Sequence, residues 1–164
     1  MTMSVHHFGM TVESIETTQA FYARHFGFAP SDEPIVITDS WFATGVDHEG
    51  AQVKIGWLRR DDAVLELHEY IEPSVSESKR LKPDITDIAA PHIAFKVDDI
   101  DELRDRLLAE GVRFYSAPVE VTSDGSASQL GGIRWCYCED PNGYIVELFW
   151  EPDNSGIDWN RDVY

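Results

Sequence analysis

Two stretches of the chain decide its fold: residues 7–12 read HFGMTV and residues 92–97 read HIAFKV. Each begins with a histidine, and its apolar residues recur at every second position, which is typical of a strand with one buried face. Two later stretches also match, because residues 63–67 read AVLEL and residues 144–148 read YIVEL. We therefore predict two copies of one unit, each with an early histidine and a late glutamate.

Each copy is predicted to contain one strand, one helix and three further strands. The first helix should begin after Ser14 and stop at Gly27, and the second should begin after Asp98 or Asp99 and stop at residues 110–111. The further strands are predicted near residues 34–38, 51–58 and 63–70 in the first copy, and near 118–122, 132–138 and 144–150 in the second. A DPNG turn at residues 140–143 separates the last two strands.

These elements predict an α+β chain of two tandem modules. The first module spans residues 4–73 and the second spans residues 91–151. A polar linker at 74–90 joins them, and an acidic tail follows at 152–164.

The charge of the chain excludes several partners. Thirty acidic and 13 basic residues give a formal net charge of −17, which disfavours nucleic acid and anionic membrane surfaces. No apolar run approaches the roughly 18 residues of a membrane span. The first residues lack the basic and apolar regions of a secretory signal, so we expect a cytoplasmic protein.

Strand alternation places four metal-ligating residue types on the faces opposite the predicted core. His7 is out of phase with Phe8 and Met10, and His92 is out of phase with its apolar neighbours. Glu66 and Glu147 each lie in the middle of an apolar strand. If the two units pair about a pseudo-twofold axis, these four side chains converge in one cleft.

A carboxylate in an apolar strand must be paired, protonated or bound to a cation, because burying an unpaired charge costs several kcal/mol. Two imidazoles and two carboxylates suit one divalent ion that accepts nitrogen and oxygen ligands, namely Zn, Ni, Co, Mn or Fe. An octahedral ion with these four ligands keeps two positions for substrate oxygens. The sequence therefore predicts a metal site formed by His7, Glu66, His92 and Glu147.

These motifs resemble the vicinal oxygen chelate superfamily, which includes glyoxalase I, methylmalonyl-CoA epimerase, extradiol dioxygenases and fosfomycin-resistance proteins. The resemblance covers residues 4–151 and is carried by His7 with Phe21-Tyr22, by residues 64–67 (VLEL), by residues 91–95 (PHIAF) and by residues 140–148 (DPNGYIVEL). It implies paired βαβββ modules whose sheets form an open cup around the metal. The ligand set His, Glu, His, Glu is similar to that of bacterial glyoxalase I.

The sequence departs from glutathione-using glyoxalases at two positions. Thr11 stands where those enzymes typically carry an arginine for the glutathione carboxylate, and Tyr70 stands where they carry asparagine. Lys96, four residues after His92, is a candidate to supply the positive charge instead. We predict Lys96 and Thr11, together with His68 and Phe149, as substrate-binding residues.

The leading functional hypothesis is a lyase or isomerase that stabilises an enediolate of a small 2-hydroxycarbonyl, 2-oxo or acyl-thioester substrate. Glu147 is the first candidate for the base and Glu66 the second. The alternative is an Fe(II) extradiol dioxygenase, because His7, His92 and Glu147 alone make a two-histidine, one-carboxylate triad. A third hypothesis is a resistance protein that only binds a small molecule. We also expect a homodimer, because the strand edges of an open cup invite pairing.

Overall fold

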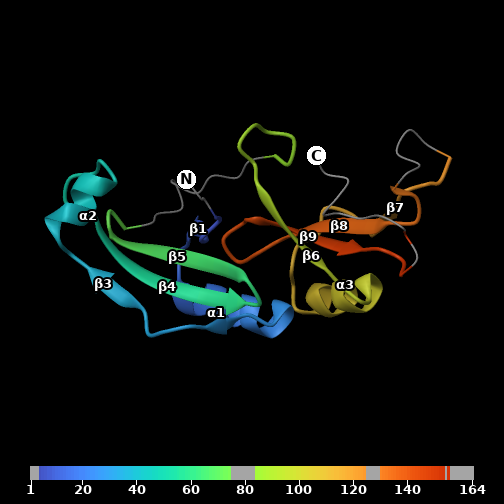
Figure 1. Ribbon diagram of the computed structural model, residues 1–164, viewed down its shortest axis with the longest axis horizontal. Helices are drawn as coiled ribbons and strands as arrows, with labels where there is room; N and C mark the ends of the chain where they lie inside the picture. The colour runs from blue at the N-terminus through green and yellow to red at the C-terminus, as the bar shows by residue number, and fades with distance from the viewer. Residues whose placement is uncertain (1–3, 75–83, 125–129, 154, 156–164) are drawn as a thin grey trace. The chain divides into compact units, whose positions relative to one another are not determined.

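The computed structural model describes residues 4–74, 84–124, 130–153 and 155 (Figure 1). The chain divides into two compact units, residues 1–82 and 83–164, and the described part of each contains one sheet, with two helices in the first unit and one in the second. The α+β class and the tandem arrangement are therefore as predicted. Parts of the predicted linker (75–83) and tail (154 and 156–164) lie outside the described residues.

The first unit contains a five-stranded sheet. Its strands lie in the order β1-β5-β4-β2, and β3 also pairs with β4. Strand β1 runs parallel to β5, and the other pairs are antiparallel. The elements are β1 (Phe8–Thr11), α1 (Ile15–Phe26), β2 (Ala29–Pro30), β3 (Ile35–Ile37), α2 (Ser40–Gly45), β4 (Gln52–Arg60) and β5 (Ala63–Glu72).

The second unit repeats this topology with a four-stranded sheet in the order β6-β9-β8-β7. Strand β6 runs parallel to β9, as β1 does to β5, and the remaining pairs are antiparallel. Its elements are β6 (His92–Lys96), α3 (Ile100–Ala109), β7 (Val119–Glu120), β8 (Arg134–Glu139) and β9 (Ile145–Trp150).

The helix ends follow the predicted capping signals. The Ser14 side chain accepts a hydrogen bond from the Thr17 amide at 3.1 Å, and Gly27 ends α1 with a φ of 67°. In the second unit Asp99 is the cap, since its carboxylate accepts from the Glu102 amide at 2.9 Å. These contacts satisfy amide groups that the first helical turn leaves without partners.

The core of the first unit lies between α1 and one face of β4 and β5. Ile15, Tyr22, Leu65 and Leu67 are all buried there. Gly56 allows the close approach, because a Cβ at this position would lie 2.9 Å from Cγ2 of Ile15. The opposite face of the sheet carries both polar side chains, such as Glu66 and His68, and a second apolar cluster around Phe42.

Three features differ from the sequence-based expectation: the two-residue strand β2, helix α2 and the exposure of Phe8. Helix α2 was not predicted, because six residues are too few to show a helical period. It buries Phe42 in a cluster with Ala51, Val53 and Ile55. Phe8, assigned to the core from its phase, is 47 % exposed, because it begins the edge strand β1 and has only β5 beside it.

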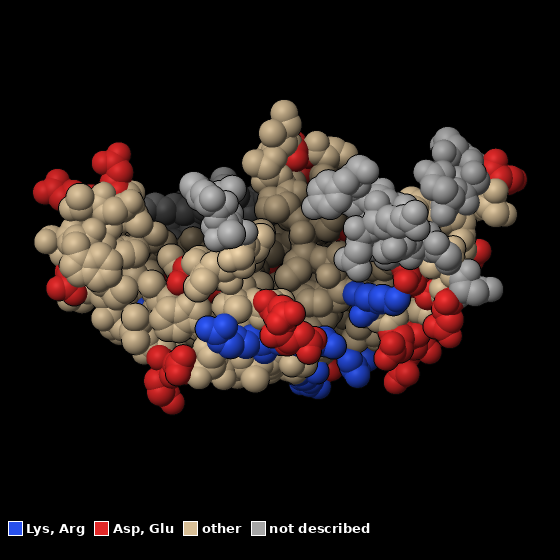
Figure 2. All heavy atoms as spheres, in the orientation of Figure 1, with Lys and Arg blue, Asp and Glu red and all other residues tan. Residues whose placement is uncertain are grey.

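Both units contain acidic and basic side chains. Figure 2 shows acidic side chains in greater number than basic ones on the visible face. None of the helices in the described parts of the chain is long and apolar enough to cross a membrane.

Candidate functional site

The first unit brings His7 and Glu66 together. Glu66 lies in the middle of β5, next to Gly9 of β1 and opposite Trp57 of β4. His7 lies immediately before β1, and its Nε2 atom is 3.2 Å from Oε2 of Glu66. The Glu66 side chain is only 18 % exposed, so this carboxylate sits on the face of the sheet in a largely enclosed setting.

Three further side chains surround this pair. His68 Nε2 lies 2.8 Å from Glu66 Oε2, and the Trp57 indole Nε1 donates to Glu66 Oε1 at 3.2 Å. His6 Nδ1 lies 2.8 Å from His7 Nδ1. A partner on Nδ1 leaves Nε2 of His7 available as a ligand, which is the arrangement usual for metal-binding histidines. The contacts of Trp57 and His6 were not predicted from the sequence.

The second unit brings His92 and Glu147 together in the same way. His92 Nε2 lies 3.0 Å from Glu147 Oε2. Tyr137, opposite Glu147 on β8, hydrogen-bonds to the carboxylate, and its ring packs 5.4 Å from the His92 ring. Burial raises the pKa of Glu147 above its ordinary value, while His92 and Tyr137 act in the opposite direction.

The two pairs are equivalent by strand register. Glu66 aligns with Gly9 on the parallel neighbour and with Trp57 on the antiparallel neighbour. Glu147 aligns with Ala94 and Tyr137 in the corresponding strands. The motifs repeated in the sequence therefore occupy equivalent positions in the two sheets.

The separations within each pair suit ligands of one metal ion. Two N or O ligands, each about 2.1 Å from an octahedral or tetrahedral ion, lie about 3.0–3.4 Å apart. The pairs measure 3.2 Å and 3.0 Å, so each residue pair fits adjacent ligand positions. Within the described residues, no group of three or more His, Cys, Asp and Glu side chains is assembled to hold a metal. The four-residue site stays a prediction.

The predicted substrate-binding residues lie on the same strands as the pairs. Thr11 aligns with His68, and Lys96 aligns with Phe149. Lys96 Nζ is 2.6 Å from Glu151 Oε1, so its charge already has a partner within the second unit. His68 lies against Glu66 itself, which gives it a position beside the expected ligand.

The two cysteines are not part of the candidate site. Cys136 and Cys138 are fully buried, and neither forms a disulfide. Burial raises the pKa of the Cys136 thiol to about 11 and that of Cys138 to about 12. Both are therefore protonated at neutral pH, and neither is suited to act as a thiolate nucleophile or ligand.

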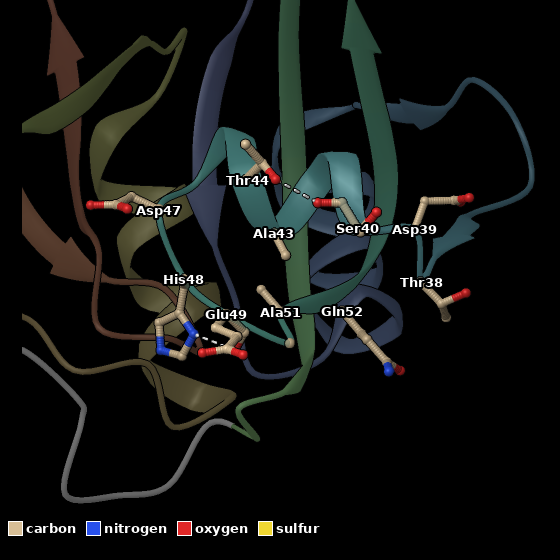
Figure 3. A pocket seen from close by; sticks show the side chains of 11 residues that line it. Thr38, Asp39, Ser40, Ala43, Thr44, Asp47, His48, Glu49, Ala51 and Gln52 are labelled. Carbon is tan, nitrogen blue, oxygen red and sulfur yellow. Dashed lines mark hydrogen bonds between the residues drawn. The ribbon is translucent and has the colours of Figure 1, made fainter.

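A cavity of about 670 Å³ opens between α2 and the start of β4 (Figure 3). Its lining includes Asp39, Asp47 and Glu49, while the small side chains of Ala43 and Ala51 face each other across it. None of the predicted metal or substrate-binding residues lines this cavity. The His–Glu pairs are thus separate from it.

Comparison with known proteins identifies the family. The family model of the Glyoxalase/Bleomycin resistance protein/Dioxygenase superfamily matches residues 4–148. No curated protein gives a significant sequence match.

Solved structures share the fold at low sequence identity. A glyoxalase family protein from Bacillus cereus is 18 % identical, with a TM-score of 0.76, covering 92 % of this chain and 95 % of that one. A glyoxalase/dioxygenase from Nostoc punctiforme is 22 % identical, with a TM-score of 0.59 and 92 % coverage of both chains. The fosfomycin resistance protein FosX from Listeria monocytogenes is 16 % identical, with a TM-score of 0.60, covering 96 % and 100 %. On the match over residues 4–148, the chain belongs to the Glyoxalase/Bleomycin resistance protein/Dioxygenase superfamily.

Proposed function

We propose that this chain is a metal-dependent lyase or isomerase in which His7, Glu66, His92 and Glu147 bind one divalent ion. The observation that carries the proposal is the repeated His–Glu pair, with equivalent strand register and ligand-like separations of 3.2 Å and 3.0 Å. When bound, the ion would supply positive charge that stabilises negative charge on two neighbouring substrate oxygens.

Glu147 is the residue proposed to move the proton. Burial raises its pKa, which makes the carboxylate a stronger base than an ordinary surface glutamate. Its Oε2 atom is held by His92, and Tyr137 supplies a second contact. Glu66 ranks second as the base, because three side chains contact its two oxygens and restrain it.

The proposed substrates are small 2-hydroxycarbonyl, 2-oxo or acyl-thioester compounds. Thr11 has no positive charge with which to bind the carboxylate of glutathione, and Lys96 is paired with Glu151. A substrate that places no free carboxylate beside Thr11 or Lys96 therefore fits the chain better than a glutathione adduct.

An Fe(II) dioxygenase is the second candidate, favoured by the contacts of Glu66. Because His68 and Trp57 already bind both of its oxygens, Glu66 could stay off the metal. The remaining His7, His92 and Glu147 would then form the triad that supports Fe(II) and O₂ chemistry.

One paired experiment separates the two functions. Protein loaded separately with Zn, Ni, Co, Mn or Fe(II) is incubated in D₂O with candidate 2-hydroxycarbonyl compounds and thioesters, and deuterium incorporation at the substrate carbon is followed by NMR. Oxygen uptake with catechols is measured under Fe(II). Metal-dependent exchange is the expected result. Oxygen uptake without exchange on any substrate would replace the lyase or isomerase with the dioxygenase.

We propose that the protein is a homodimer in solution. Strands β1 and β6 each lie at an edge of their sheet, and such edges favour pairing with another strand. Light scattering coupled to size exclusion, at micromolar concentration, should give about twice the chain mass of 18.6 kDa. A mass equal to that of one chain would refute the dimer.

A further inference from the structure

Glu66 is held at both carboxylate oxygens by side chains that are not among the predicted ligands. The Trp57 indole donates to Oε1 at 3.2 Å, and His68 Nε2 lies 2.8 Å from Oε2. His7 Nε2 approaches the same Oε2 at 3.2 Å. Trp57 therefore restrains rotation of the carboxylate from one side, while His68 and His7 meet it on the other.

Strand geometry fixes these contacts. His68 follows Glu66 by two residues on β5, so both side chains lie on one face of the sheet. Trp57 is the cross-strand partner of Glu66 on β4. Directly opposed Cβ atoms in an antiparallel pair are about 4.5–5.5 Å apart, which is within reach of an indole.

The packing around α2 supports Trp57 and His68, the two side chains that hold Glu66. Trp57 and Tyr70 pack against the core cluster of Phe42, Ala51, Val53 and Ile55. The Tyr70 ring lies 6.2 Å from Phe42 and 6.5 Å from the His68 ring. The short helix that sequence periodicity missed therefore supports the orientation of the side chains that hold Glu66.

The second unit lacks one of these donors. Tyr137 occupies the position opposite Glu147 that Trp57 occupies opposite Glu66. Two residues after Glu147 stands Phe149, where the first unit has His68. The first carboxylate thus has an imidazole neighbour that has no counterpart beside the second.

We propose that His68 and Trp57 are positioning residues that hold Glu66 with Oε2 directed toward His7, so that Glu66 is the immobile carboxylate of the metal site. The inference rests on the proposed function, in which Glu66 is a ligand. Partners that orient a ligand contribute to affinity because the ligand loses less freedom when the ion binds.

The test measures the dissociation constant for Zn²⁺ by competition with a chromophoric chelator. His68→Phe introduces the residue found at the equivalent place in the second unit, and Trp57→Phe keeps an aromatic ring without the N–H. Each should weaken Zn²⁺ binding by about 10–100-fold, the usual effect of removing such a partner. Trp41→Phe and His48→Gln, at exposed positions, are the matched controls and should leave the affinity within about twofold.

A double-mutant cycle distinguishes positioning from general damage. In a Glu66→Ala background, His68→Phe should have no further effect, because the proposed role acts through Glu66. His68→Gln keeps a donor and should recover most of the affinity. Circular dichroism and thermal melting of each metal-free variant establish that it folds.

Each contrary outcome has a separate meaning. Equal Zn²⁺ affinity in wild type and in both variants would overturn the positioning role while leaving the metal site intact. Tighter binding after His68→Phe would show that His68 holds Glu66 off the metal, which also overturns it. A wild-type protein that binds none of the five metals would remove the proposed function and this inference together.

Discussion

Replacing Glu147 by Gln is expected to lower proton exchange at the substrate carbon by about 10²–10⁴-fold, the usual cost of removing a general base. Glutamine keeps the size of the side chain and an oxygen that can bind metal, but it cannot accept the proton. The variant should therefore retain metal with weaker affinity. Deuterium incorporation in D₂O measures the chemistry, and chelator competition measures the metal.

Two matched variants complete this experiment. Glu66→Gln removes the other carboxylate and should reduce metal affinity more than it reduces exchange in the fully loaded protein. Glu120→Gln, at an exposed position on β7, should leave both unchanged. Exchange that continues undiminished in Glu147→Gln would assign the proton transfer to Glu66 instead.

Removing metal is expected to lower the thermal midpoint by roughly 5–10 °C. A ligand at 100 times its dissociation constant stabilises the folded state by about 2.7 kcal/mol, and about 1 kcal/mol shifts the midpoint of a chain of this length by about 2–4 °C. Differential scanning fluorimetry with excess chelator, followed by readdition of Zn, Ni, Co, Mn or Fe(II), measures the change and its recovery.

The same measurement has an internal control. A His7→Ala, His92→Ala double variant should melt at one temperature with and without chelator, because each His–Glu pair has lost its nitrogen ligand. A wild-type midpoint unaffected by chelator, with no metal found by elemental analysis, would argue against the four-residue site.

The helix ends and the longer strands could be predicted from short stretches of the sequence. Ser14, Asp99 and Gly27 act through hydrogen bonds and backbone conformations that span only a few residues, so the helix ends could be predicted. The positions of the longer strands followed from period-two alternation, which reflects burial of one face. Helix α2 has neither a long period nor a side-chain cap, and its order comes from burial of Phe42.

The sequence by itself indicated the family, the repeat and the four candidate ligands, because strand phase and the spacing of motifs can be read along the chain. Tertiary structure alone decided which side chains surround each carboxylate. Trp57 meets Glu66, and Tyr137 meets Glu147, only through the register between antiparallel strands. Phe8 is exposed for a similar reason, since burial at a sheet edge depends on what lies beside the strand rather than on phase. Register and edge position arise from contacts between distant residues, which alternation along one strand does not encode.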